Sequence, residues 1–330
     1  MYPYLPNLSI IIPTLNNEKS LPFFLNLLKL QIYPKDKIEM IIIDGGSSDK
    51  TVTIAKKIKI KVLHNPYVLA EPAISLGLNN ARGDLTMILA VDNYFKDPNA
   101  VKIIVRVFSD KAIYAAFPKH DNEDNYSFFS KYHNIFTDPF NHFVYGEAAN
   151  ARTFYRVYKT IKHNEIYDVY NYLSNPIKPM IAFAQGLTIR SSYRKNKKNY
   201  FDDCKPIVDL INKKKQIAYV HSVAIYHNTI KDLPHFIMKQ QWATQNAIEK
   251  KNYGLIHRTD TFTFFQKIKI ILWPIYAFSF ILPLIRSFVG LIKDRQPIWL
   301  FHPIACWLSA YSSLVQILNY NLNKKSTPRQ

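Results

Sequence analysis

The sequence contains very little cysteine, which limits how the protein can be stabilised and how it can bind metals. Cys204 and Cys306 are the only cysteines among 330 residues, and they lie far apart, without the close spacing of a metal-binding motif. A disulfide framework is therefore not indicated, and a reducing compartment is expected. No secretory signal sequence is recognised before the first apolar run, so none is expected.

Acidic residues are also scarce, since 24 Asp and Glu stand against 43 Lys and Arg and give a formal net charge of +19. Nucleic acid would explain this excess, and so would an anionic membrane surface together with a diphosphate-bearing ligand. No zinc-finger, helix-turn-helix or RNA-recognition signature accompanies the charge, so no nucleic-acid partner is expected. The hydrophobic content of 48% excludes a disordered protein.

Short apolar runs bounded by proline or glycine predict buried strands in the first third of the chain. Residues 8–12 and 40–43 are too short for helices and read as central parallel strands. Residues 18–30 repeat apolar side chains at a helical period, as expected for the crossover of a βαβ unit. A second amphipathic helix is predicted over 51–58, followed by a short strand at 61–63. The pattern predicts an α/β fold.

A polar loop directly follows each of three apolar runs. The loops are residues 12–16 (IPTLN), 44–49 (DGGSSD) and 91–93 (VDN). In an open α/β sheet the ligand binds beyond the carboxyl ends of the strands, where all three loops would lie. The three loops are therefore expected to converge on one site.

These segments, in this order and spacing, resemble the family 2 glycosyltransferases. The matching residues are 9–18 (SIIIPTLNNE), 43–51 (IDGGSSDKT) and 81–84 (ARGD), which leads into 91–93. The likeness covers roughly residues 7–250 and is specific only as a set, because each motif alone is weak. It implies a GT-A fold, with a Rossmann-like, mostly parallel sheet flanked by helices. It also implies an enzyme that transfers a sugar from a nucleoside diphosphate with inversion, usually with Mg²⁺ or Mn²⁺.

The resemblance places the donor nucleotide against the first two loops. Pro13, Thr14 and Glu18 would line the nucleotide, while Asp44 would accept a hydrogen bond from the base or ribose, with Gly46 beside it. A carboxylate can accept from a uracil or guanine N–H, so a UDP- or GDP-linked donor is expected. Two alternatives stay open: Asp44 could only form the turn before the two glycines, and Glu18 could only favour a helix start.

The resemblance also suggests a metal site, but one ligand is missing. Asp92 matches the last Asp of the family's DxD signature, whereas Ala90 stands where the first Asp would be. Asp92 and the Asn93 carbonyl remain to meet a hard cation. His227 matches a histidine that reaches the metal or diphosphate in many relatives, and the missing Asp increases its importance. The alternatives are a polar turn at residues 92–93 and a structural histidine at a strand end.

The acceptor side is expected around a later pair of acids. Asp202 and Asp203 resemble the family's acidic pair, which implies that Asp203 is the general base that takes a proton from the acceptor hydroxyl, with Asp202 as a nucleotide-side neighbour. Capping of the following helix is the alternative. Gln185, Gly186 and Trp242 are further acceptor-side candidates, although Trp242 could instead be a buried helix residue.

The C-terminal tail predicts membrane association. Residues 270–285 and 296–323 carry no charge, and the second stretch is long enough to span a bilayer. Interrupting prolines and the shortness of the first stretch favour an interfacial or re-entrant helix, and Trp, Tyr and Lys residues suit the headgroup region. An in-plane hairpin, a two-span hairpin, and a helical pair packed on the catalytic domain or on a dimer partner stay open.

The sequence thus predicts a catalytic domain over residues 1–255, with a nucleotide-binding half (1–120) and an acceptor half (121–255), and hydrophobic helices over 256–330. The expected function is transfer of a sugar to a lipid-linked or cell-surface glycan acceptor at the cytoplasmic face of a membrane. A non-catalytic nucleotide-sugar-binding relative is the alternative, because the first DxD carboxylate is missing. A homodimer stays open.

Overall fold

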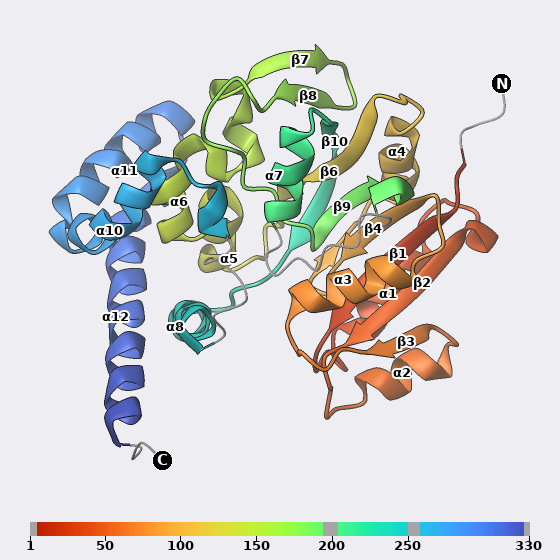
Figure 1. The fold of residues 1–330 in the computed structure, drawn as a ribbon, viewed down its shortest axis with the longest axis horizontal. Helices are drawn as coiled ribbons and strands as arrows, with labels where there is room; N and C mark the ends of the chain where they lie inside the picture. Colours follow the sequence, from red (N-terminus) through yellow and green to blue (C-terminus); the bar gives the residue numbers. More distant parts are fainter. Residues whose placement is uncertain (1–4, 194–203, 250–257, 327–330) are drawn as a thin grey trace.

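The computed structural model describes residues 5–193, 204–249 and 258–326. Within these residues ten strands form one sheet, with helices on both faces and a group of helices beside it (Figure 1). The strands are β1 (Leu8–Thr14), β2 (Ile38–Asp44), β3 (Lys61–His64), β4 (Leu85–Leu89), β5 (Asn93–Tyr94), β6 (Ile113–Asp121), β7 (Lys159–His163), β8 (Asp168–Asn171), β9 (Gln185–Arg190) and β10 (Gln216–His227). The helices are α1 (Leu21–Lys29), α2 (Thr51–Lys57), α3 (Ala70–Asn80), α4 (Ala100–Val107), α5 (Phe128–Phe136), α6 (Pro139–Tyr145), α7 (Lys205–Asn212), α8 (Leu233–Glu249), α10 (Phe264–Ser279), α11 (Ile281–Asp294) and α12 (His302–Ser326).

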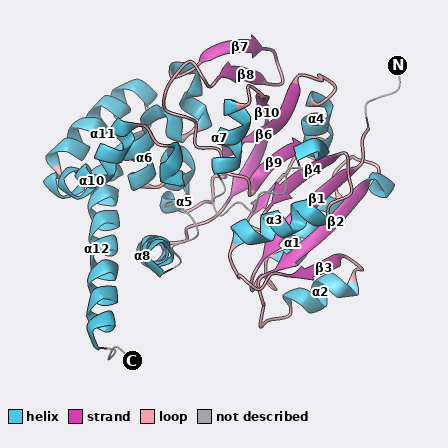
Figure 2. Cartoon of the chain, viewed as in Figure 1, coloured by secondary structure: helices cyan, strands magenta, loops and turns pink. Residues whose placement is uncertain are grey.

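The sheet is parallel where strands were predicted and mixed beyond them (Figure 2). Its order is β3-β2-β1-β4-β9-β6-β10-β8-β7, and β5 pairs with the end of β10. β1 runs parallel to β2 and β4, β2 to β3, and β6 to β10, whereas β9 is antiparallel to both β4 and β6. This arrangement confirms the α/β class with a parallel central sheet. The direction of β9 was not predicted, because hydrophobic period does not encode strand direction.

Both faces of β1 are buried, because helices cover the two sides of the sheet. Every residue of β1 is buried. Ile10 and Ile12 pack with α1 and α4 on one side, and Ile11 packs with α3 on the other, since successive side chains of a strand alternate. A strand covered on both faces is expected to be apolar along almost its whole length, and β1 is, apart from the buried Ser9 and Thr14. The predicted crossover helix is α1, which begins at Leu21.

The register of the parallel strands brings the predicted loops to one edge. Thr14 at the end of β1 lies beside Asp44 at the end of β2, and Asp44 lies beside His64 at the end of β3. Asp92 follows β4, which is parallel to β1. All these loops therefore leave the sheet at its carboxyl edge, where α/β proteins bind ligands.

The C-terminal helices form a bundle beside the sheet. α12 packs along α8 and against α10 and α11. Trp299, in a short 3₁₀ helix at Pro297–Phe301, is buried with Tyr132 of α5 and Phe236 of α8. α10 and α11 meet at a bend of 90°. The tail is thus tied to α5 and α8 by an aromatic core.

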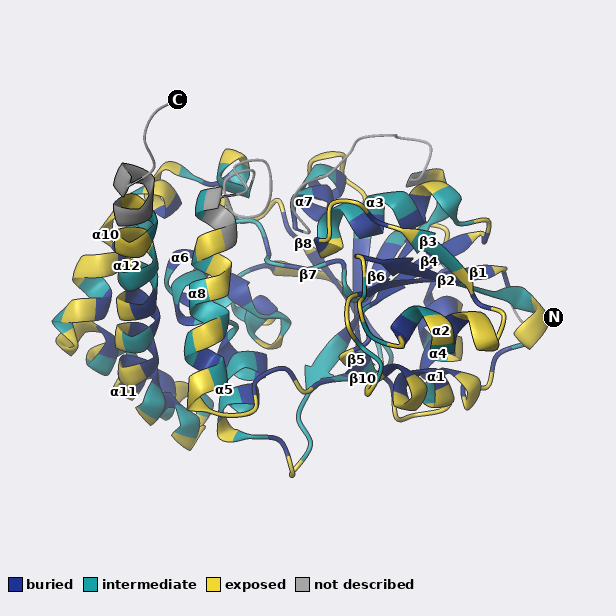
Figure 3. Ribbon diagram, turned by 90° about the horizontal axis from the view of Figure 1, so that it is seen from below, coloured by how far each residue is buried: buried dark blue, intermediate teal, exposed yellow. Residues whose placement is uncertain are grey.

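The tail consists of the apolar helices that the sequence predicted. Within the described residues, one helix, Pro297–Asn321, is long and apolar enough to cross a membrane, with a mean hydropathy of 1.3, and the bent pair α10–α11 meets the same criterion only when taken together. Many residues of α10 and α11 are exposed (Figure 3), and large apolar side chains are among them. They include Phe264, Phe265, Ile271, Ile275, Ile281, Ile285, Phe288 and Ile292.

Candidate active site

The loops after β1 and β2 lock together through reciprocal hydrogen bonds. The backbone N–H of Asn16 donates to Oγ of Ser47 over 2.8 Å, and the N–H of Ser48 donates to Oδ1 of Asn16 over 2.9 Å. The N–H of Asn17 donates to Oγ1 of Thr51 over 2.8 Å. The two predicted donor loops therefore form one continuous surface.

Asp44 organises its own turn. Its Oδ2 accepts from the N–H groups of Gly46 and Ser47, each over 3.0 Å, and its Oδ1 accepts from the Ser47 hydroxyl over 2.5 Å. Gly46 has a φ of 92°, a conformation that favours glycine. The turn-forming interpretation of Asp44 is thus realised, and a contact between this carboxylate and a donor stays a prediction.

Glu18 bridges to the start of the next helix. Its Oε2 accepts from the N–H of Lys50 over 3.0 Å, and its own N–H donates to Oδ2 of Asp49 over 3.0 Å. Glu18 lies before α1, but its carboxylate accepts a hydrogen bond from the residue that precedes α2. It therefore stabilises the start of α2 rather than that of α1. Pro13 and Thr14 end β1 as buried residues, and the Thr14 hydroxyl donates to the Ile12 carbonyl over 3.1 Å.

Asp92 and His227 meet at the carboxyl edge of the sheet. Oδ2 of Asp92 lies 3.2 Å from Nε2 of His227. The cause is the short strand β5, in which Asn93 pairs with His227 at the end of β10. Asn93 also donates from Nδ2 to Oδ1 of Asp92 over 2.8 Å. The three residues predicted to hold a metal therefore lie together.

Electrostatics keep the Asp92 carboxylate ionised. Burial raises its pKa, but attraction and hydrogen bonding by His227, with attraction by Lys239 of α8, lower it to about 2. Half of the Asp92 side chain is still accessible to solvent. Burial in turn lowers the pKa of Lys239, against the attraction of Asp92. An accessible carboxylate of this kind suits a cation.

The donor atoms at this edge fit a divalent cation in part. Nδ1 of His227 and Oδ1 of Asn93 are buried and have no hydrogen-bond partner within the described residues. One carboxylate, one imidazole and one amide oxygen are a small ligand set for Mg²⁺ or Mn²⁺, so the remaining positions would fall to a diphosphate and water. The missing carboxylate at Ala90 is not replaced by another acid among these neighbours.

Two further histidines surround His227. The ring centres of His120 of β6 and His133 of α5 each lie 6.2 Å from that of His227. Burial, with repulsion from His227 and Arg152, lowers the pKa of His120 to about 3, and burial with nearby positive charge holds that of His133 well below its usual value. Both imidazoles are therefore neutral at pH 7. Sequence reasoning missed them, since three separate elements bring them together and no spacing motif links them.

A cavity of about 190 Å³ opens beside these histidines. Gln185, an acceptor candidate, lines it together with His120, His133, His227 and Arg152. Gly186 is not among its lining residues but explains how Gln185 is presented. Its φ is 79°, and it forms a bulge where β9 pairs with β4, while a Cβ there would approach Ile225 and Pro118 to 3.0 Å.

The remaining acceptor-side candidates are placed differently. Trp242 on α8 is 60% exposed, so the alternative of a buried helix tryptophan is wrong. The predicted helix after the acidic pair is α7, which Cys204 precedes. Asp202 and Asp203 themselves lie outside the described residues, so the general base stays a prediction.

A parallel α/β half-sheet, with interlocked loops and an acid–imidazole pair at its carboxyl edge, is the arrangement expected of a GT-A fold. Residues 9–171 match the model of glycosyl transferase family 2. The chain belongs to this family.

Curated relatives share only a segment with this chain. A dolichyl N-acetyl-alpha-D-glucosaminyl phosphate 3-beta-D-2,3-diacetamido-2,3-dideoxy-beta-D-glucuronosyltransferase of Methanococcus voltae is 36% identical over 94 residues, which cover 26% of this chain and 29% of the relative. The poly(ribitol-phosphate) beta-N-acetylglucosaminyltransferase TarS of Staphylococcus aureus is 29% identical over 92 residues, 26% of this chain and 16% of TarS. The chain thus spans less than a third of the length of these relatives.

Solved structures match over most of the chain. The mannosyltransferase PcManGT from Pyrobaculum calidifontis, in complex with GDP-Man and Mn²⁺, has a TM-score of 0.55 at 14% identity and covers 94% of this chain and 88% of its own. Residues 1–349 of S. aureus TarS, in complex with UDP-GlcNAc, give a TM-score of 0.51 at 15% identity over 96% and 92%. At these identities the likeness shows the fold alone.

Proposed function

We propose that this protein is an inverting glycosyltransferase that moves a sugar from a nucleoside diphosphate to a phosphate-bearing, lipid-linked or cell-surface glycan. The observation that carries the proposal is the Asp92–His227 pair, 3.2 Å apart, at the same sheet edge as the interlocked loops after β1 and β2. The catalytic domain would comprise residues 1–255 and the membrane-associating tail residues 256–330.

The donor would lie across the interlocked loops, with its base toward Asp44 and its diphosphate toward Asp92. Thr14, Glu18 and Gly46 would line the nucleotide, and Asp202 would complete its surroundings. A UDP- or GDP-linked sugar is the proposed donor, and the complexes of the two structural neighbours with UDP-GlcNAc and GDP-Man support that choice. Asp44 would have to exchange one of its turn hydrogen bonds for a bond from the base.

Asp92, Asn93 and His227 would hold Mg²⁺ or Mn²⁺, which offsets the negative charge that develops on the departing diphosphate. The complex of PcManGT with Mn²⁺ supports a metal in this role. Asp203 would accept the proton of the acceptor hydroxyl as its oxygen attacks the anomeric carbon from the face opposite the diphosphate. His120 and His133, both neutral, would orient polar groups of the sugars without adding charge.

The acceptor would approach through two adjoining cavities. The cavity beside His227 shares Asn150 and Arg152 with a second cavity of about 220 Å³, which is also lined by Arg156, Arg286 and Lys293. This second cavity lies between the acceptor half and the tail. A ligand that fills both cavities would extend from the carboxyl edge of the sheet at Asp92 and His227, here called the catalytic edge, to the C-terminal helices.

Charge in the second cavity favours a phosphate. Arg156 is paired with Asp294 over 2.7 Å and Lys293 with Glu147 over 3.0 Å. Arg152 and Arg286, by contrast, have no carboxylate partner within the described residues, and Arg286 stacks 4.6 Å from the Trp299 ring. Arginine is the preferred partner of phosphate in proteins. The names of both relatives given above also include a phosphate.

The exposed apolar faces of α10 and α11 support contact with a membrane, which we propose to be at its cytoplasmic face. Monomeric soluble proteins seldom expose so many large apolar side chains together. The bend of 90° between these helices suits an in-plane hairpin, whereas the helix Pro297–Asn321 suits a span. Both arrangements would bring the second cavity close to lipid headgroups.

The first test is a thermal-shift panel of UDP, GDP, CMP and dTDP with and without Mn²⁺, followed by hydrolysis of the matching sugar donors. A metal-dependent shift for one diphosphate, with slow donor hydrolysis, is expected. The absence of any nucleotide response would contradict the assigned site. Donor binding without hydrolysis or transfer to any lipid phosphate would instead favour the non-catalytic relative, to which the missing carboxylate at Ala90 points.

A further inference from the structure

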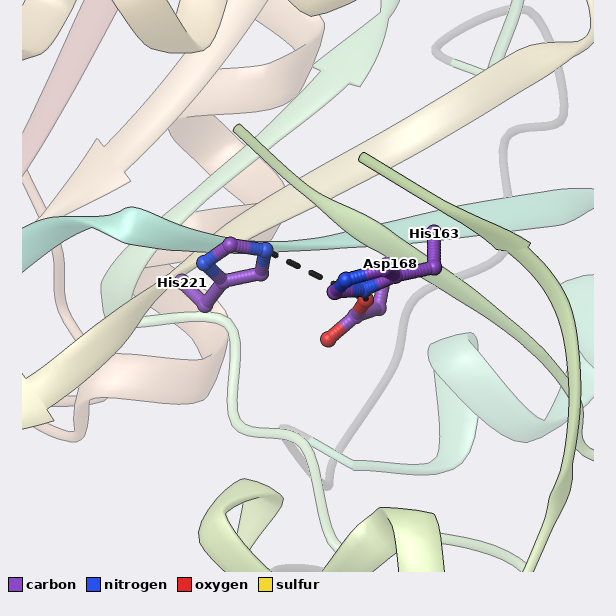
Figure 4. Close-up of side chains that lie close together, drawn as sticks. All are labelled: His163, Asp168 and His221. Atoms are coloured by element: carbon purple, nitrogen blue, oxygen red, sulfur yellow. Dashed lines mark hydrogen bonds and ion pairs between the residues drawn. The ribbon is translucent and has the colours of Figure 1, made fainter. Parts of the chain in front are cut away.

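A second group of metal-ligand side chains lies away from the catalytic edge, where the hairpin of β7 and β8 meets β10 (Figure 4). It consists of His163 at the end of β7, Asp168 at the start of β8 and His221 within β10. One ligand atom from each residue lies within 4.8 Å of the others. Nδ1 of His163 is 2.5 Å, and Nε2 of His221 is 3.9 Å, from Oδ1 of Asp168.

The carboxylate at the centre of this group is held in place. Asp168 is buried, and its second oxygen, Oδ2, accepts from the Tyr170 hydroxyl over 3.1 Å. No lysine or arginine forms an ion pair with Asp168 in the described part of the chain. A buried carboxylate flanked by two imidazoles and oriented by a hydroxyl is the pattern of a metal ligand with an outer hydrogen-bond partner.

We propose that His163, Asp168 and His221 bind a zinc-type divalent cation, which joins the β7–β8 hairpin to β10. Two imidazole nitrogens and one carboxylate oxygen suit Zn²⁺, whereas Mg²⁺ and Mn²⁺ prefer more oxygen ligands. The remaining coordination position would be open to water, because His163 is 73% exposed. This site is independent of the proposed function.

Only small adjustments separate the observed geometry from a coordinated one. Ligand atoms about 2.1 Å from a tetrahedral zinc lie roughly 3.4 Å from one another. The exposed His163 ring would move outward, giving up its hydrogen bond to Asp168, and His221 is already near the required separation. Nε2 of His221 now lies 3.0 Å from the Asn164 carbonyl oxygen. That nitrogen would turn its lone pair to the metal, with the ring proton on Nδ1.

The position of the site explains what the cation would stabilise. Every residue of β7 is exposed, so this edge strand gains little from apolar burial. β8 pairs with β10 only at Val169 and Asp168, opposite Ala218 and Tyr219. A cation bound by all three strands would close the hairpin onto the sheet. His227 lies six positions after His221 along β10, a span of roughly 20 Å, so the two metal sites would act separately.

The test is titration of the untagged, metal-free full-length chain with Zn²⁺, in an Asp92→Asn background that weakens the other site. One equivalent of Zn²⁺ should bind and raise the melting temperature. His163→Ala and His221→Ala should each weaken Zn²⁺ binding by more than about tenfold. His235→Ala, which removes a histidine from α8, is the matched control and should bind zinc as its parent does.

Two results would overturn the proposal: no stoichiometric zinc binding, or unchanged binding in His163→Ala. Because the His163 side chain is mostly exposed, this variant should fold even where His221→Ala does not. The single variant His163→Ala, with Asp92 unchanged, should keep the nucleotide response of the wild type, which would show that the site at Asp92 and His227 is intact. Failure of the zinc site therefore cannot be mistaken for failure of the proposed function.

Discussion

Nε2 of His227 lies 3.2 Å from Oδ2 of Asp92, although 135 residues separate them along the chain. The contact depends on two residues of β5 that pair with the end of β10. It gives the protein one ionised carboxylate and one imidazole where relatives with the full signature would carry a further acid.

Asp92→Asn should weaken binding of the donor diphosphate and of Mn²⁺ together. The substitution removes the negative charge that would attract the cation and that interacts with Lys239. We expect the affinity to fall at least about tenfold, or ~1.4 kcal/mol. Calorimetric titration of UDP and GDP at several Mn²⁺ concentrations measures both effects. Asp36→Asn, in the turn before β2, is the control. Unchanged metal dependence in Asp92→Asn would show that Asp92 is not a metal ligand.

Asp203→Asn should abolish transfer and leave donor binding largely intact. Loss of a general base costs about 10²- to 10⁴-fold in turnover, because the acceptor hydroxyl then has no group to take its proton. The measurement is the rate of transfer beside the donor dissociation constant. Asp209→Asn, on α7, is the matched control. Normal turnover in Asp203→Asn would refute the assignment of the base.

Arg286→Gln should impair use of a phosphate-bearing acceptor without affecting donor hydrolysis. Its guanidinium has no carboxylate partner within the described residues and is positioned by stacking on Trp299. Loss of a charge-assisted hydrogen bond should raise the KM for a polyprenyl phosphate by about tenfold or more. Lys102→Gln, on the exposed side of α4, controls for charge. Equal KM values in Arg286→Gln and wild type would contradict the binding of a phosphate in the second cavity.

Replacing the exposed apolar residues of α10 should release the protein from membranes. The double variant Ile271→Ser/Ile275→Ser removes two side chains that are 76% and 66% exposed. Each buried aliphatic side chain contributes roughly 1.5–3 kcal/mol, so co-sedimentation with anionic vesicles should fall by at least about tenfold. Ile161→Ser, on exposed β7, is the control. Vesicle binding that is unaffected by the double variant would exclude this face as the contact.

Acidification should destabilise the protein through His120. Its folded pKa is lowered to about 3 by burial, His227 and Arg152, whereas an unfolded histidine titrates near pH 6.5. The unfolded chain therefore binds the proton first, and the free energy of unfolding falls as pH decreases from about 6.5 toward 3, by up to about 1.4 kcal/mol per pH unit.

His120→Gln should reduce the slope of the free energy of unfolding against pH by up to about 1.4 kcal/mol per pH unit, which corresponds to one proton. Urea unfolding at pH 6.5, 5.5 and 4.5 measures it, in a range above the pKa of Asp92. His64→Gln, at the end of β3, is the control for loss of an exposed histidine. An identical slope in His120→Gln and wild type would show that His120 is not responsible.

The first third of the chain was the most predictable part of the fold, because the sequence signals for its strands and helices are local. Residues 8–12, apart from Ser9, and residues 40–43 are apolar, as expected for strands covered on both faces, and α1 shows a clear helical period. The polar loops that follow these strands lie at one edge of the sheet, because the strands are parallel. Asp92 and His227 could be paired in advance only through the family resemblance.

Other parts depend on contacts that no local pattern encodes. Antiparallel β9 lies between β4 and β6 although it comes later in the chain than both. His120 becomes a neighbour of His227 because β6 pairs with β10, and His133 because its neighbour Asn134 donates to the His227 carbonyl. Arg152 and Arg286 line one cavity only across the boundary with the tail. The role of Asp44 was difficult to predict for a different reason. The sequence Asp-Gly-Gly is equally compatible with a turn-forming aspartate and with one that binds a ligand.

Helix α8 links the tail to the catalytic edge. Lys239 stands close enough to Asp92 to lower its pKa, while Gln240 accepts from Ser309 of α12 over 2.9 Å and Thr244 lies 2.8 Å from Ser313. A continuous helix transmits a displacement along its axis with little bending. A shift of α12 on contact with lipid would therefore move the ammonium group beside Asp92, so that lipid composition and the rate of sugar transfer are expected to vary together.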